Sequence, residues 1–332
     1  MTAREWIRAD ETAKDFFART IAERPPPLPP PLHRVPLRAG NVVEIVGPSP
    51  SAKSQILLEV AVNCILPKDW KGVSYGGLEL SVMFIDLDCR FDVLRLLQLL
   101  KCRISCANGS NREHKEEMST TRKEYNDVYD EDLIEVCLMR FRYIRCYDSF
   151  EFLATLKGLA VELQTSRTKL CSSVSFLMID SIGAYYWVDR ASTSLPFESS
   201  SRRTFSLQSV SETVVNEIRN VLLLHPMLVL TTKAAIFSDK GAKHDAKSFR
   251  KHYTSETLHE TTMGSGSENS LYREYMPSVW QSFVTHRLLL HPCLDRFSDV
   301  VTSGQVFVAE WLLPLLGTRD NFVVRDDGIC VV

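Results

Sequence analysis

The chain has 332 residues, of which 45% are hydrophobic and 24% charged, and its formal net charge is −2. This is enough apolar material for one large domain or two small ones, and any contact with nucleic acid has to come from a local basic patch. No apolar run reaches the roughly 18 residues of a membrane span, and the first residues lack the apolar centre of a signal peptide, so we expect no membrane association. The nine cysteines include no Cys-x-x-Cys pair, which is typical of scattered thiols in a reducing compartment.

The residues before the core predict an arm and a linker. Residues 1–24 predict a short N-terminal helix or arm, because Phe16, Phe17 and Ile21 fall on one side of a helix over 11–24. Such a helix either docks on a partner or covers the chain's own core. Residues 25–36 contain two runs of three prolines and predict a stiff polyproline II linker. The core is therefore expected over residues 37–332.

Residues 42–54 have the layout of a phosphate-binding loop (P-loop). A β-branched run ends in Gly47, a tight loop follows, and Lys53-Ser54 opens an apolar segment with helical spacing. In such a loop the backbone N–H groups face the phosphates of ATP, the lysine neutralises phosphate charge and the serine hydroxyl binds Mg²⁺. The predicted nucleotide-binding residues are Gly47, Pro48, Ser49, Pro50, Ser51, Ala52, Lys53 and Ser54.

The loop departs from the usual G-x-x-x-x-G-K-[ST] pattern. Pro50 removes a backbone N–H donor, and Ala52 adds a Cβ where glycine permits close approach or an unusual φ. A strand-to-helix turn with a chance Lys-Ser pair would explain the same residues without any phosphate. The motif therefore predicts the fold family, whereas the two departures argue against efficient chemistry.

The chain beyond this loop alternates apolar strands with helices, which predicts an α/β fold with a mostly parallel central sheet and helices on both faces. The last segments predict a partly antiparallel extension of the sheet. Strands are expected at 42–46, 82–86, 141–145, 176–180 and 227–231, helices at 55–66, 91–103, 150–166 and 209–224, and the extension at 283–290, 305–310, 322–324 and 329–332. Polar stretches near 107–132, 189–203 and 238–274 lack the apolar residues needed to pack and are predicted as mobile inserts.

Two of the predicted strands end in carboxylates. Asp180 would stand beside the P-loop at the carboxyl edge of the sheet, where it can hold Mg²⁺ together with Ser54. Asp88 follows the strand at 82–86 and is the candidate catalytic residue, because a carboxylate there can orient or deprotonate an attacking water. The alternative role for Asp88 is an N-cap of the helix that begins near Phe91.

The order of these motifs resembles the RecA-type recombinase core. Several strings that have no catalytic task are similar to eukaryotic recombinase paralogues, from about residue 40 to about residue 290. The core motifs are the P-loop, Phe84-Ile85-Asp86-Leu87-Asp88, Met178-Ile179-Asp180-Ser181 and Val229-Leu230-Thr231-Thr232-Lys233, and the other strings include Cys64–Lys68, Phe91–Leu96 and Tyr185-Tyr186-Trp187-Val188-Asp189-Arg190. The resemblance implies a RecA-like P-loop ATPase core.

The resemblance also implies a role. Recombinase paralogues form heteromeric complexes in the nucleus that assist homologous recombination repair of DNA double-strand breaks and support recombinase loading on single-stranded DNA. The implied partners are other paralogues, the D-type directly, with single-stranded or branched DNA bound through the complex. Only 36 residues precede the predicted core, too few for the helical N-terminal domain of a full recombinase, so we expect no filament of this chain alone.

Two more positions differ from active recombinases. The family's catalytic glutamate aligns with Asp88, which is one methylene shorter, and its phosphate-sensing glutamine aligns with Lys233, which cannot accept a hydrogen bond from water. We therefore expect weak or structural binding of ATP and Mg²⁺, with weak or no hydrolysis. The alternatives are an active DNA-dependent ATPase, which Pro50 and Ala52 argue against, and a scaffold that binds no nucleotide, which Lys53 and Ser54 argue against.

The last insert contains a candidate DNA contact. Residues 238–252 carry five basic and two acidic side chains, a local charge of +3, and Phe249 and Tyr253 offer rings for base stacking. The alternative is a solvated loop of mixed charge. The candidate DNA-binding residues are Lys240, Lys243, Lys247, Arg250 and Lys251.

Overall fold

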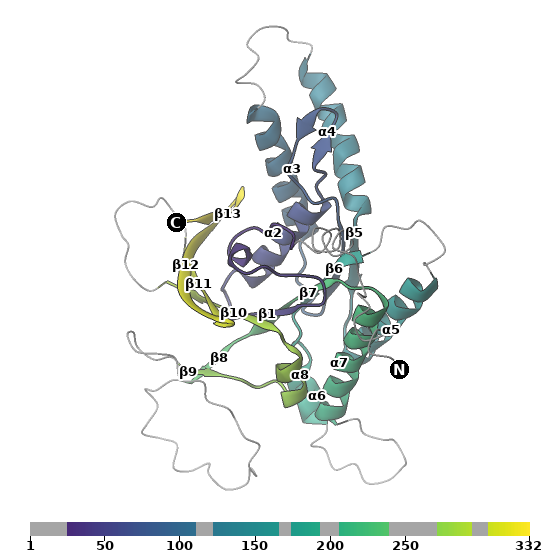
Figure 1. Ribbon diagram of the computed structural model, residues 1–332, viewed down its shortest axis with the longest axis vertical. Helices are drawn as coiled ribbons and strands as arrows, with labels where there is room; N and C mark the ends of the chain where they lie inside the picture. Colours follow the sequence, from purple (N-terminus) through teal and green to yellow (C-terminus); the bar gives the residue numbers. More distant parts are fainter. Residues whose placement is uncertain (1–24, 111–121, 166–173, 193–205, 239–270, 294–304) are drawn as a thin grey trace, which may run out of the picture.

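The computed structural model describes residues 25–110, 122–165, 174–192, 206–238, 271–293 and 305–332. They build a nine-stranded sheet in the order β13-β12-β11-β10-β1-β7-β6-β4-β5 (Figure 1). The strands from β10 to β5 run parallel, and β11 to β13 continue from β10 as an antiparallel meander. The strands are β1 (Val42–Gly47), β4 (Ser81–Asp86), β5 (Phe141–Arg145), β6 (Val174–Asp180), β7 (Leu228–Ala234), β10 (His286–Pro292), β11 (Val306–Leu313), β12 (Leu315–Arg325) and β13 (Gly328–Val331).

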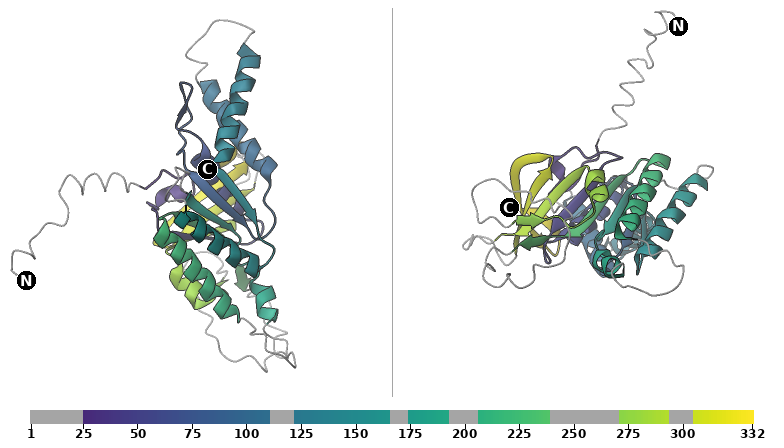
Figure 2. Two further views of the ribbon diagram at one scale, coloured as in Figure 1. Left: turned by 90° about the vertical axis from the view of Figure 1, so that its right-hand side faces the viewer. Right: turned by 90° about the horizontal axis from the view of Figure 1, so that it is seen from below.

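Helices cover both faces of this sheet. One face packs against α2, α3 and α4 and the other against α5, α7 and α8, with α5 and α7 side by side (Figure 2). Because alternate residues of a strand point to opposite faces, Val43 and Ile45 enter the first core and Val42 the second. The helices are α2 (Lys53–Ile65), α3 (Val93–Ser110), α4 (Arg122–Met139), α5 (Ser149–Thr165), α6 (Tyr186–Ser192), α7 (Leu207–Leu224) and α8 (Ser278–Phe283). In the described ranges, no helix combines the length and the apolar character needed to cross a membrane.

This architecture confirms the predicted fold class, with its parallel centre and antiparallel extension. The start of the extension differs from the prediction, because residues 278–283 form α8 and β10 begins only at His286. Phe283, the first residue of the predicted strand, lies with Trp280 on the buried side of the short helix. β10 itself is parallel to β1, so the antiparallel part begins one strand later, at β11.

The proline-rich segment belongs to the core and is not a free spacer. Leu28, Leu32 and Val35 are buried in the cluster formed with α2 and α3. Arg34, in the short 3-10 helix η1 (Leu32–Arg34), donates from Nε to both carboxylate oxygens of Asp320 on β12, each at 2.7 Å. The linker prediction is wrong for these residues, because the apolar side chains between the prolines reach the sheet instead of water.

The predicted inserts have ordered ends. α3 continues through Ser110 and α4 begins at Arg122, and the two helices extend together beyond the sheet (Figure 1). Residues 189–192 belong to α6, and the ends of the last insert pair as β8 (Ile236–Ser238) and β9 (Leu271–Arg273). A second ribbon pairs β2 (Asp69–Trp70) with β3 (Val73–Ser74). The predicted arm at 1–24 and the insert residues 111–121, 193–205 and 239–270 lie outside the described ranges.

Candidate functional site

The P-loop connects β1 to α2 at the carboxyl edge of the parallel strands. Gly47 is sterically required, since a Cβ there would lie 2.5 Å from Ser51 Oγ and 2.6 Å from the carbonyl oxygen of Leu290. Ala52 adopts φ 64° and ψ 12°, the left-handed conformation that favours glycine. The expectation that Ala52 occupies a position of unusual φ is therefore confirmed.

Lys53 lies over the loop that precedes it. Its Nζ donates to the carbonyl oxygens of Gly47, at 2.8 Å, and Pro48, at 2.7 Å, and to Ser51 Oγ at 3.1 Å. Burial lowers the pKa of Lys53 to about 8, and the negative charge of Asp180 opposes this effect. A phosphate at this point would compete with the two carbonyls for the same N–H donors.

Asp180 and Ser54 come together on neighbouring elements. Asp180 ends β6, which one strand, β7, separates from β1. Its buried carboxylate accepts a hydrogen bond from the hydroxyl of Thr232. Burial raises the pKa of Asp180, whereas hydrogen bonds from Ser54 and Thr232 lower it. The structure thus joins the two predicted Mg²⁺ ligands, and Thr232 is a supporting residue that the sequence analysis did not single out.

Asp88 does not cap a helix. Helix α3 begins at Val93, and the carboxylate that accepts its first N–H groups belongs to Asp92, at 2.8 Å from the nitrogen of Leu94. Asp86 is buried and accepts bonds from the nitrogen of Phe91 and the hydroxyl of Tyr143. Burial, followed by the charge of Asp180, raises the pKa of Asp88, so Asp88 stands within electrostatic reach of the predicted metal site.

Lys233 is fully buried and faces carboxylates. Its Nζ lies 2.8 and 2.7 Å from the two oxygens of Glu274 and 2.9 Å from Glu44 Oε1. Burial alone would raise the pKa of Glu274, but the charge of Lys233 and its hydrogen bonds outweigh it and hold the pKa below its ordinary value. The position that aligns with the phosphate-sensing glutamine therefore faces two protein carboxylates, from Glu274 and Glu44.

An aromatic group, made up of Tyr186, Trp187 and Tyr275, lies beside the end of the last insert. Trp187 on α6 is 53% exposed, stacks on Tyr275 at a centroid distance of 5.8 Å and has Arg190 over its ring at 5.9 Å. Tyr186 packs edge-on against both rings. The signal for this pair in the sequence is its spacing, since Trp187 and Arg190 stand three residues apart and so share one face of a helix. The candidate DNA-binding residues from Lys240 to Lys251 lie outside the described ranges.

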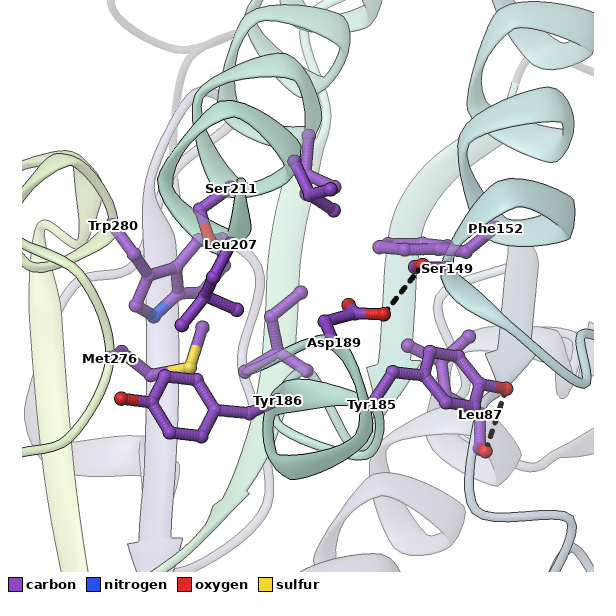
Figure 3. Close-up of a pocket in the computed structure, with 13 residues that line it drawn as sticks. Leu87, Ser149, Phe152, Tyr185, Tyr186, Asp189, Leu207, Ser211, Met276 and Trp280 are labelled. Carbon is purple, nitrogen blue, oxygen red and sulfur yellow. Dashed lines mark hydrogen bonds between the residues drawn. The ribbon is translucent and has the colours of Figure 1, made fainter. Parts of the chain in front are cut away.

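A cavity of about 40 Å³ lies between α5, α6, α7 and α8 (Figure 3). Asp189 points into it and accepts a hydrogen bond from Ser149 Oγ at 3.1 Å, and burial raises the pKa of Asp189. A space of this size holds one or two water molecules. Its lining includes no residue of the P-loop, so it is not the nucleotide site.

The residues at the P-loop fit a nucleoside triphosphate with Mg²⁺. The first turn of α2 has no side-chain cap, so its N–H groups are not occupied by a capping side chain, and such a turn attracts phosphate. Lys53 supplies a cation, and Ser54 with Asp180 supplies the oxygen ligands that Mg²⁺ prefers. Pro48 and Pro50 each take one N–H donor out of this set.

Comparison with known proteins decides the family. The DNA repair protein XRCC2 homolog of Arabidopsis thaliana is 45% identical over 336 residues, which cover 98% of this chain and 89% of that protein. The chain belongs to the XRCC2 family. The DNA repair protein XRCC2 of Mus musculus is 29% identical over 293 residues, covering 87% of this chain and 84% of that protein. No protein-family model matches the chain. Membership of the XRCC2 family confirms the resemblance found in the sequence.

Proposed function

We propose that the chain is a subunit of a heteromeric recombinase-paralogue complex that assists homologous recombination repair of DNA double-strand breaks in the nucleus. The observation that carries the proposal is the similarity to two DNA repair proteins over most of the chain. A RecA-like sheet with a P-loop at its carboxyl edge supports it. In this role the complex supports loading of the recombinase on single-stranded DNA.

The repair role is tested in cells that lack their own XRCC2 relative. A reporter that restores a fluorescent protein by recombination after one induced break measures homologous repair. Expression of the full chain together with a D-type paralogue is expected to restore reporter signal. The paralogue expressed alone is the control. Failure to restore the signal, when both proteins are present at normal levels, would contradict the proposal.

ATP and Mg²⁺ are proposed as structural ligands of the P-loop. Lys53 on α2 would neutralise phosphate charge, and Ser54 on α2 and Asp180 on β6 would supply oxygen ligands to Mg²⁺. Hydrolysis is expected to be weak, because Asp88 is one methylene shorter than glutamate and, within the described residues, no hydrogen bond orients its carboxylate. A misplacement of about 1 Å can cost on the order of 10²-fold in rate.

Equilibrium binding of Mg·ATP separates this proposal from its alternatives. Measured on the chain in complex with its partner, binding is expected to be lost in Lys53→Ala and retained in Lys68→Ala, which removes an exposed lysine beyond the same helix. Turnover stimulated by single-stranded DNA would favour an active ATPase. Absence of binding in the unaltered protein would favour a scaffold.

The outer edge of β5 is the proposed partner surface. Within the described residues β5 pairs only with β4, so its other side is the edge of the sheet at which an extended partner segment can add as a further strand. Tyr143, Tyr147 and Phe150, 37%, 67% and 61% exposed, flank this edge. Co-purification with a D-type paralogue is expected to fall in Phe150→Ala and to persist in Leu223→Ala, which alters an exposed leucine on α7.

DNA contact is proposed for the surface around Trp187. The half-exposed indole of Trp187 can contact a base, and Arg190 beside it can attract the neighbouring phosphate. Tyr275, which stacks on Trp187, lies immediately after the insert that carries Lys240, Lys243, Lys247, Arg250 and Lys251. Single-stranded or branched DNA bound through the complex would therefore meet both features.

A further inference from the structure

Four charged side chains form a buried cluster beside β1. This charge cluster consists of Glu44, Lys233, Glu274 and Arg287, and it is neutral as a whole. Glu44 and Lys233 are 0% exposed, and Glu274 is 6% exposed. Besides its contacts with Lys233, Glu44 accepts bonds from Arg287 Nε at 2.6 Å and Trp280 Nε1 at 2.7 Å. Buried charges at such short distances hold their elements together, because separating them leaves an uncompensated charge.

The ammonium of Lys233 has no remaining donor for a ligand. A lysine ammonium has three N–H donors, and three carboxylate oxygens of Glu274 and Glu44 lie within 2.9 Å of its nitrogen. A phosphate could gain one of these donors only by breaking a buried ion pair. The position that resembles a phosphate sensor therefore binds protein carboxylates.

Glu274 joins this cluster to the aromatic group. It directly follows β9, and its Oε1 accepts the backbone N–H groups of Tyr275 at 2.9 Å and Met276 at 3.0 Å. The ring of Tyr275 lies beside the ammonium of Lys233 at 5.6 Å and stacks on Trp187. The hydroxyl end of Tyr275 lies close to Gly183, since a Cβ at Gly183 would lie 2.3 Å from the hydroxyl oxygen.

We propose that Glu274 is a positioning residue that fastens the end of β9 to the P-loop strand β1 and seats Tyr275 against Trp187, with or without bound nucleotide. Lys233 holds the carboxylate from one side, and the Tyr275 and Met276 N–H groups hold it from the other. The consequence of this arrangement for DNA binding rests on the proposed function. Because the Trp187 surface is already formed without nucleotide, its affinity for single-stranded DNA does not depend on ATP.

Hydrogen exchange of the Tyr275 and Met276 amides tests the fastening directly. In the full chain, Glu274→Gln is expected to speed their exchange by about tenfold or more, because the neutral amide releases Lys233 and accepts more weakly. Asp320→Asn is the matched control, since it neutralises another buried carboxylate that pairs with an arginine. It is expected to leave these two amides unchanged. Glu274→Asp, which keeps the charge but withdraws it by one methylene, provides the same test if Glu274→Gln does not fold.

The same measurement decides the role of nucleotide. In the unaltered chain, saturating Mg·ATP is expected to change exchange at the two amides by less than about twofold. A larger change, or unchanged exchange in both Glu274 variants, would overturn the proposal. Neither of these hydrogen-exchange measurements requires the chain to bind DNA.

DNA affinity of the partnered complex tests the consequence. A labelled single strand is expected to bind several-fold more weakly to Glu274→Gln than to Asp320→Asn, and equally with and without Mg·ATP. Normal binding by Glu274→Gln, despite faster exchange, would overturn the link to the Trp187 surface. If the unaltered complex binds no single strand, the proposed DNA contact fails while the exchange result still decides the fastening.

Discussion

The pKa of Lys53 determines the pH range in which the P-loop is expected to bind nucleotide. Burial lowers that pKa to about 8, so the ammonium loses its proton as the pH rises above this value. The neutral amine does not attract phosphate, and only the charged fraction of the protein is competent to bind. Between about pH 7.5 and pH 9 we therefore expect the affinity for Mg·ATP to fall roughly tenfold. Equilibrium titration at constant ionic strength measures this dependence.

Lys53→Arg is the control for this pH dependence. A guanidinium stays charged throughout the range, so the variant is expected to bind with an affinity that changes little with pH. Both proteins experience the same ionisation of ATP itself, and their ratio isolates Lys53. Parallel slopes for the two proteins would show that another group controls the binding.

At the residue scale, the sequence predicted the site residues whose positions follow from local spacing along the chain. Lys53 and Ser54 follow from the strand–loop–helix pattern, and Asp180 from its place at the end of a buried strand. Lys233 was misassigned because its partners, Glu44 and Glu274, come from β1 and from the end of an insert that was expected to be loop. A glutamate inside an apolar strand was the available signal, since a buried carboxylate requires a cation.

At the element scale, the start of α3 distinguishes two aspartates that the sequence alone does not. Asp92 Oδ1 accepts the N–H groups of Leu94 and Arg95, at 2.8 and 3.2 Å, whereas Asp88 lies outside the helix. Asp92→Ala is expected to lower the free energy of unfolding by about 1 kcal/mol through loss of this cap. Asp88→Ala is expected to change it by less than about 0.5 kcal/mol. Urea denaturation of both variants measures the difference, and a larger loss in Asp88→Ala would contradict the assignment.

The helices α3 and α4 show why polar inserts are hard to predict. A segment that extends beyond the sheet needs only a narrow apolar stripe, which Leu133 and Cys137 provide at one end of α4. The polar composition of residues 107–132 was typical of a loop, and that part of the prediction failed where α3 ends and α4 begins. Strands and helices that pack on the sheet were predicted because packing requires regular apolar spacing.

At the scale of the whole molecule, the two ends of the described chain meet. Arg34 in η1 binds Asp320 on β12, and Arg95 on α3 donates to the carbonyl oxygens of Arg325, at 2.6 Å, and Asp326, at 2.9 Å. These contacts attach the antiparallel meander to α3 and to the proline-rich segment. The segment is therefore part of the core. The sequence did not indicate this role, because runs of proline are typical of a linker and the partner strand β12 lies almost the whole chain length away.

Leu32 tests this role of the proline-rich segment. Its side chain is 0% exposed, so Leu32→Ala is expected to lower the free energy of unfolding by about 2–5 kcal/mol, the range for a buried leucine. Leu223→Ala, at a leucine 82% exposed on α7, is the matched control and is expected to cost less than about 0.5 kcal/mol. Urea denaturation of the full chain measures both. Equal stability of the two variants would return residues 25–36 to the status of a spacer, whereas the expected difference places the start of the RecA-like core before residue 37.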